Sequence, residues 1–326
     1  RAGRTARVRF THPHCLTRGG ACVSADGGRT WRWHAATLDP QLEGFDYTFA
    51  ADGPVRFALA IPYTQADFDA WLTDHRPHPD LRVETLCTTE AGRAVELLRL
   101  GREVDDAPHR VAVIARQHCC ESLASFELEG LMEAVLADDD AGRWLRDNVA
   151  WAVVPFMDKD GVEAGDQGKN RQPHDHNRDW VEGRYPSVRA VRELIADWSA
   201  DDGVSLTLDL HCPWLRGEHN EDIYIVGSSN PAVWREQQAF AAHLERVNDS
   251  PLPYEAAKTL PHGQAWNVGG SAEPTSFGRW SANVAGAPLA ATIEFPYALA
   301  GGATITADAA RAFGRSVARA VREYLA

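Results

Sequence analysis

After residue 101 the sequence alternates between short apolar runs and longer segments of helical periodicity, and this alternation restricts the possible folds more than any other feature. Apolar runs of this kind are typical of strands that are covered on both faces. Strands that alternate with helices form α/β folds whose sheet lies between two helical layers. We expect strands at residues 110–117, 151–158, 205–212, 222–227 and 290–295.

Three segments of this part carry apolar residues at helical spacing. The first follows His118 and ends at the acidic run 138–140. The second spans about 187–198, and the third runs from Asp308 to the end of the sequence. The sequence shows neither an internal repeat nor a low-complexity tract.

The first hundred residues consist of short β segments separated by Gly, Pro and Asp, with one expected helix at about 65–73. This pattern predicts a small β-sandwich. At 326 residues the chain has room for two domains, so we expect a β-sandwich domain at 1–104 and an α/β domain at 105–326. The expected amino-terminal strands are RTARVRF, TWRWHAA, FDYTFAA, VRFALAIPY and VELLRLG.

Charge and cysteine content narrow the class of protein. Lys and Arg number 33 against 46 Asp and Glu, a net charge of -13, which argues against nucleic acid or an anionic membrane as a partner. No apolar run reaches the ~20 residues that span a bilayer. The six cysteines are too few for a disulfide scaffold, so reduced thiols in the cytoplasm are expected. Because the sequence begins at Arg1 rather than Met, a removed leader is left open.

A candidate metal site lies at the ends of two expected strands. His118 and Glu121 stand three residues apart directly after the strand at 110–117, at the start of the helix that follows. His211 ends another expected strand. Ligands of parallel sheets bind beyond such strand ends, and two nitrogens with one carboxylate are typical of a catalytic zinc site. Asp209, two residues before His211, is a candidate for orienting its imidazole.

An isolated His-x-x-Glu is more often a pair of surface or capping residues than a metal site. A second feature adds context. The segment 156–180, FMDKDGVEAGDQGKNRQPHDHNRDW, begins where an expected strand ends and is rich in Gly, Asp and Arg. Long polar loops at this edge of a sheet usually carry function.

The motifs occur in the order HxxE, DGVxxG, NRxW, DLH and a strand that carries TIE. This order resembles that of the funnelin-type zinc metallocarboxypeptidases. The segments FALAIPYTQADFDAWL and VETLCTTEAGRAVELLRLG resemble the β-sandwich domain and junction of the cytosolic carboxypeptidase branch, so the resemblance covers nearly the whole chain. It implies a mixed, mostly parallel sheet in a carboxypeptidase domain that follows a small β-sandwich domain.

The resemblance also implies a function. By position, His118, Glu121 and His211 match the ligands of one zinc ion per chain, and Glu294 in ATIEFPY matches the general base. Bound zinc lowers the pKa of its water and polarises a carbonyl, and a nearby carboxylate accepts the proton of that water. The implied enzyme is a peptidase that hydrolyses the C-terminal bond of a peptide or protein. For Glu294 a buried ion pair is the alternative.

Asn177 and Arg178 match the residues that hold the terminal carboxylate of the substrate in this family. Arg171 is the nearest candidate for the arginine that stabilises the oxyanion, although the loop around it has an unusual shape. The family's capping tyrosine is missing from 271–287. Arg279 lies in that segment and is a candidate contact for an acidic side chain or carboxylate of the substrate. For Arg171 and Arg178 the alternative is a solvated surface charge.

The residues around the motifs also depart from the family pattern. Cys119 and Cys120 separate His118 from Glu121, and Cys212 follows His211, so a thiolate ligand or a redox-sensitive disulfide is an alternative to small buried residues. The run His-Asp-His at 174–176 invites a second-metal interpretation, whereas residues that orient Asn177 and Arg178 are the simpler one.

Two other classes of function compete with the peptidase. A deacylase of the succinylglutamate desuccinylase and aspartoacylase group shares the fold, the HxxE and the later histidine. The separate amino-terminal β domain and the NRDW motif favour the peptidase. A noncatalytic binding protein is the third class, and the joint presence of ligands, base and carboxylate-binding pair disfavours it.

Overall fold

A seven-stranded mixed sheet organises most of the chain. The computed structural model describes residues 2–12, 14–39, 41, 43–199, 203–268 and 274–326. The strand order is β11-β12-β10-β8-β9-β7-β6, with the central strands β12, β10, β8 and β9 parallel to one another and the remaining neighbours antiparallel. The strands are β6 Leu81–Thr88, β7 Ala94–Gly101, β8 His109–Ala115, β9 Val149–Val154, β10 Leu206–His211, β11 Tyr224–Ile225 and β12 Leu289–Glu294.

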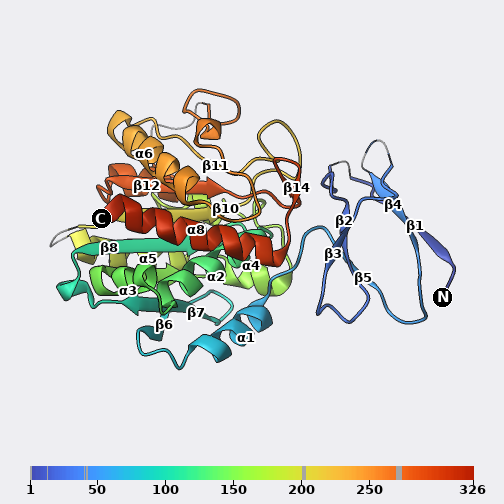
Figure 1. The fold of residues 1–326 in the computed structure, drawn as a ribbon, viewed down its shortest axis with the longest axis horizontal. Coiled ribbons are helices and arrows are strands. Elements are labelled where there is room, and N and C mark those ends of the chain that lie inside the picture. Colours follow the sequence, from blue (N-terminus) through green and yellow to red (C-terminus); the bar gives the residue numbers. More distant parts are fainter. Residues whose placement is uncertain (1, 13, 40, 42, 200–202, 269–273) are drawn as a thin grey trace.

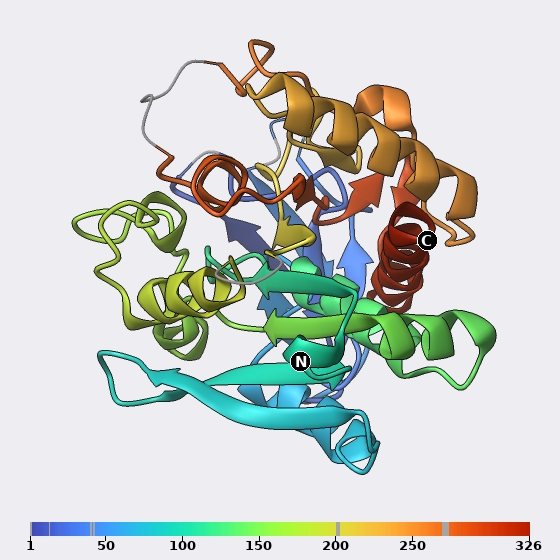
Figure 2. The same cartoon turned by 90° about the vertical axis from the view of Figure 1, so that its left-hand side faces the viewer.

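Helices cover both faces of this sheet, as Figure 2 shows. Alternate residues of β8 point to opposite sides: Val111 and Val113 belong to the core shared with α2 and α8, whereas Ala112 and Ile114 belong to the core shared with α5. The helices are α1 Gln65–His75, α2 Leu123–Leu136, α3 Asp140–Asn148, α4 Lys159–Ala164, α5 Pro186–Ser199, α6 Pro231–Val247, α7 Phe277–Asn283 and α8 Ala307–Leu325. Within the described residues, none of these helices has the length and apolarity to cross a membrane.

The predicted α/β architecture is confirmed. The five strands expected after residue 101 correspond to β8 to β12, and the three expected helices correspond to α2, α5 and α8. The helix expected at 65–73 is α1, which begins with a capping box in which Thr64 and Asp67 satisfy each other's backbone donors.

The strands before residue 60 form two small antiparallel sheets, β1 with β4 and β3-β2-β5, at one end of the molecule (Figure 1). They share a small core that includes Leu16, Val23 and Phe45. The Trp33 indole ties this region to the α/β part by donating to the Ile305 carbonyl at 2.7 Å. The remaining strands are β1 Thr5–Arg9, β2 Ala21–Ser24, β3 Arg32–His34, β4 Gly44–Thr48, β5 Arg56–Ala58, β13 Leu299–Ala300 and β14 Ala303–Thr304.

The pairing of one predicted amino-terminal strand was wrong. The segment VELLRLG lies in β7, which pairs with β9 of the large sheet rather than with the strands before residue 60. Its inward side chains Leu98 and Leu100 are fully buried in the α/β core, because β6 and β7 extend the sheet as an antiparallel hairpin. The division of the chain into domains at 104/105 stays a prediction.

Helices α2 and α8 pack at very short range through two glycines. A Cβ added at Gly314 of α8 would overlap the carbonyl oxygen of Glu127 in α2, and one added at Gly130 of α2 would overlap the carbonyl oxygen of Arg311 in α8. Glycine at both positions therefore lets the two backbones approach more closely than any side chain permits.

We predict that Gly314→Ala destabilises the fold by about 1–3 kcal/mol, because overpacking outweighs the ~1 kcal/mol that alanine adds to helix propensity. Denaturant unfolding of the purified variant measures this. Gly278→Ala in α7 is the matched control, since its Cβ would meet only the Thr292 hydroxyl, at 2.9 Å, and that side chain can turn away. Equal stability of Gly314→Ala and the wild type would contradict the prediction.

Candidate metal centre

The parallel strands bring distant residues to one edge of the sheet. His211 and Glu294 are the last residues of β10 and β12 and stand directly opposite each other in the ladder, so their side chains share one face. His118 and Glu121 lie in the turn that joins β8, the other neighbour of β10, to α2. The turn precedes the helix rather than forming its first residues, because α2 begins at Leu123.

A buried arginine holds this turn in shape. Arg116 directly follows β8 and has a φ of 60°, in the left-handed region. Its guanidinium donates to the carbonyl oxygen of Cys119, to that of Tyr63 at 3.2 Å and to the hydroxyl of Ser125 at 2.9 Å. These bonds fix the backbone between the two candidate ligands of the turn.

His118, Glu121 and His211 converge as predicted. Their candidate ligand atoms all lie within 4.8 Å of one another, and all three residues are buried. The Nδ1 atoms of His118 and His211 each lie 2.8 Å from a different oxygen of the Glu121 carboxylate. Among the described residues, no other set of three His, Cys, Asp or Glu meets this criterion. Two imidazole nitrogens and a carboxylate fit a divalent metal such as zinc.

Acidic side chains orient both imidazoles from behind. The Nε2 atom of His211 lies 3.0 Å from an oxygen of Asp209, as the sequence suggested, and the Nε2 atom of His118 lies 3.5 Å from Asp175. Gln117 donates to both oxygens of Asp209 at 2.9 and 2.8 Å. A carboxylate at Nε2 leaves Nδ1 of each ring facing the space between the three ligands.

Glu294 lies beside this group with one oxygen unsatisfied. Its Oε2 atom is buried and has no hydrogen-bond partner among the described residues. Burial raises the pKa of Glu294 to about 7, with the Glu121 carboxylate adding to the rise and His211 opposing it. A carboxylate of this kind is suited to accept a proton from a nucleophilic water.

His118, Glu121 and His211 are referred to below as the triad. The triad and Glu294 line a cavity of about 560 Å³, and Asn177, Arg178 and Arg279 line it too. Asn177 is held by hydrogen bonds of 3.1 Å from the Gln117 side chain and from the backbone N–H of Phe277 to its Oδ1. The Arg178 side chain is exposed and donates to the Asn177 carbonyl at 2.9 Å. Arg279 belongs to α7 and is half-buried.

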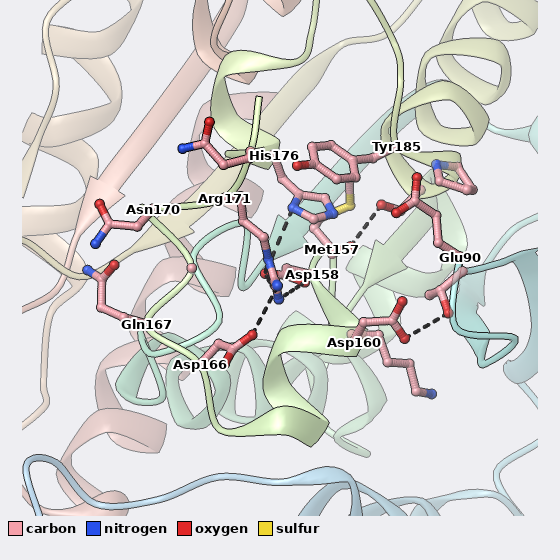
Figure 3. Close-up of a pocket in the computed structure, with 16 residues that line it drawn as sticks. Glu90, Met157, Asp158, Asp160, Asp166, Gln167, Asn170, Arg171, His176 and Tyr185 are labelled. Atoms are coloured by element: carbon pink, nitrogen blue, oxygen red, sulfur yellow. Dashed lines mark hydrogen bonds and ion pairs between the residues drawn. The ribbon is translucent and has the colours of Figure 1, made fainter. Parts of the chain in front are cut away.

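The structure does not bring Arg171 to the triad. Its guanidinium forms a two-pronged pair with Asp158, at 2.9 Å in both contacts, and a further ion pair with Asp166 at 3.0 Å. These residues line a separate cavity of about 480 Å³, shown in Figure 3 with the buried His176 above them. The predicted contact of Arg171 with an oxyanion therefore has no support in this geometry.

Lys169, which the sequence analysis did not single out, lies beside the triad. Its Nζ atom is 3.0 Å from Oε1 of Glu121 and 5.5 Å from the centre of the Trp214 ring, and the residue lines the same cavity as the triad. Burial alone would lower the pKa of Lys169, but the Glu121 and Glu294 carboxylates raise it above its usual value. The signal in the sequence is slight, because Lys169 is one more charge in a polar loop.

Among the described residues, neither the cysteines nor the run 174–176 forms a second metal site. Cys119 donates to the Asp166 carbonyl at 3.0 Å, all six cysteines are free thiols, and burial raises the thiol pKa of Cys119, Cys120 and Cys212. This favours small buried residues over thiolate ligands. The three residues of 174–176 diverge: they contact Asp179, His118 and Tyr185, respectively.

Comparisons with known proteins agree with this geometry. A family model described as zinc carboxypeptidase matches residues 69–231, half of the chain. Cytosolic carboxypeptidase 6 of Caenorhabditis elegans is 26% identical over 212 residues, which cover 62% of this chain and 45% of that protein. The chain thus spans less than half the length of that relative.

Solved structures match over the whole chain. A metallo-carboxypeptidase from Burkholderia cenocepacia superimposes with a TM-score of 0.82 at 24% identity, covering 99% of this chain and 86% of that one. A metallo-carboxypeptidase from Pseudomonas aeruginosa gives a TM-score of 0.81 at 22% identity, with 100% and 88% covered. These structures share the fold, including the small amino-terminal β region.

We predict that Asp209→Asn lowers zinc affinity by about 10–100-fold, because the amide no longer fixes the His211 ring through a charged contact. Competition with a chromophoric chelator measures the affinity. Asp160→Asn is the matched control: this carboxylate accepts from Thr89 and Arg93, both at 2.8 Å, and lines the other cavity. Unchanged zinc affinity in Asp209→Asn would show that Asp209 does not orient the ligand.

Proposed function

The chain belongs to the zinc carboxypeptidase family, and from this membership we propose that it is a zinc-dependent carboxypeptidase. The reaction is hydrolysis of the C-terminal peptide bond, or of a side-chain amide, of a peptide or protein. One observation carries the proposal: a buried His-Glu-His group and the unsatisfied Glu294 carboxylate lie together on the wall of an open cavity.

His118, Glu121 and His211 would hold one zinc ion per chain. Bound zinc supplies a water of lowered pKa and polarises the scissile carbonyl. Glu294 takes the proton of the attacking water and passes it to the departing amine. Its place beside His211 in the ladder keeps the carboxylate within the cavity and on the same face of the sheet.

Asn177 and Arg178 would receive the terminal carboxylate of the substrate. A planar guanidinium binds a carboxylate through two parallel hydrogen bonds, and the exposed Arg178 lines the cavity. Arg279 lies on the same cavity wall and would contact an acidic side chain or carboxylate of the substrate. These contacts require a free C-terminus, which favours an exopeptidase over an endopeptidase.

A cytoplasmic location is part of the proposal. All six cysteines are free thiols, as in proteins of reducing compartments. The matched Caenorhabditis elegans relative is named a cytosolic carboxypeptidase.

A mixed peptide library tests the reaction. We expect loss of single C-terminal residues, detected by mass spectrometry, and full inhibition by a chelator. The library should include N-acyl amino acids, since cleavage of these alone would favour the deacylase. Stoichiometric zinc without cleavage of any member would favour a binding protein.

Glu294→Gln separates the base from the metal ligands. We predict that this variant keeps its zinc and loses about 10²–10⁴-fold in kcat, because the amide cannot accept the proton of the water. Zinc content and turnover are measured on the same preparation. The control is Glu255→Gln, a residue paired with Lys258 outside the cavity. Full turnover in Glu294→Gln would remove Glu294 from the mechanism.

A further inference from the structure

Hydrolysis of an amide places negative charge on the carbonyl oxygen, and a fixed cation near that oxygen accelerates the reaction. The described residues offer three cationic side chains on the wall of the triad cavity: Lys169, Arg178 and Arg279. We propose that Lys169 donates to the carbonyl oxygen as its charge develops. This inference rests on the carboxypeptidase function proposed above.

Arg171 is held away from the triad by its ion pairs with Asp158 and Asp166. Its partner Asp158 is only 2% exposed, and the two groups meet through two hydrogen bonds of 2.9 Å. Moving Arg171 toward the triad would leave the buried Asp158 carboxylate without its counter-charge, which is strongly unfavourable. Figure 3 shows the guanidinium directed at Asp158 and Asp166, within the second cavity.

Lys169 lies beside the candidate metal ligands in the triad cavity. Its ammonium lies 3.0 Å from Glu121, the carboxylate that sits between the two histidine ligands. Its charge also interacts with Glu294. A nucleophile activated at Glu294 attacks a carbonyl in this same space, so the carbonyl oxygen falls within the reach of a flexible four-carbon side chain.

The backbone before Lys169 explains how the loop comes so close. Gly168 has a φ of 94°, and a Cβ added there would lie 2.7 Å from the backbone nitrogen of Cys119 and 3.1 Å from the Cα atom of His118. Only glycine permits this conformation and this contact together. The loop therefore touches the turn that carries His118 and Glu121, and the next side chain along the loop reaches the triad.

The step balances without another reactant. Water gives its proton to Glu294, its oxygen bonds to the carbonyl carbon, and the electron pair of the C=O bond moves to the oxygen. Lys169 donates an N–H to that oxygen and keeps its proton. When the C=O bond re-forms, the C–N bond breaks and the amine leaves with the proton from Glu294.

The test compares Lys169→Met, which removes the charge at similar length, with Lys169→Arg, which keeps it. We expect Lys169→Met to lose about 100-fold in kcat with KM within a few-fold, to retain its zinc, and to be partly rescued in Lys169→Arg. Lys258→Met is the matched control, since Lys258 is also half-buried and paired, with Asp222 at 2.7 Å, but lies outside the cavity.

A binding measurement adds a readout other than turnover. Calorimetry with a peptide phosphonate, an anionic mimic of the tetrahedral intermediate, should show about 100-fold weaker binding to Lys169→Met. Binding of the released amino acid should change only a few-fold. Unchanged kcat and phosphonate affinity, or loss of zinc in Lys169→Met, would overturn the proposal. A wild type that cleaves no peptide would instead contradict the proposed function.

Discussion

The candidate centre depends on the buried carboxylate of Glu121. This side chain is fully buried, and a charge in that position is stable only when its hydrogen-bonding capacity is filled. His118 and His211 contact one oxygen each, and Lys169 adds an ammonium at 3.0 Å. Glu121 therefore draws together a turn, a strand end and a loop that are up to 90 residues apart in sequence.

The site combines side chains from rigid strand ends with side chains from a loop. The parallel ladder and Arg116 fix the candidate ligands and Glu294, because strand register and buried hydrogen bonds leave them few alternatives. The loop 165–178 supplies further groups that line the cavity, among them Lys169 and Asn177. Its contact with the ligand turn at Gly168 couples the two parts.

The sequence predicted the parts of the molecule that follow from local pattern and motif order. Continuous apolar runs predicted the central strands. The positions of His118, Glu121 and His211 at or just after strand ends predicted that they lie together. Pairing partners are not encoded locally, which is why VELLRLG in β7 was placed with the amino-terminal strands. The sequence also does not show which cation of the loop reaches the triad. Lys169 and Arg171 are two residues apart, yet Lys169 contacts Glu121 and Arg171 contacts Asp158. The backbone conformation at Gly168, which brings the loop against Cys119, cannot be read from the sequence.

The charge balance of the site argues for a cation beyond the side chains. Glu121, Asp209 and Glu294 are each at most 8% exposed. The Lys169 ammonium contacts one of them, Glu121, at 3.0 Å, and Oε2 of Glu294 has no partner among the described residues. Two imidazoles offset this negative charge only if both carry an extra proton. A divalent metal between the ligands satisfies the same carboxylates while the imidazoles stay neutral, which is the form in which they bind metals.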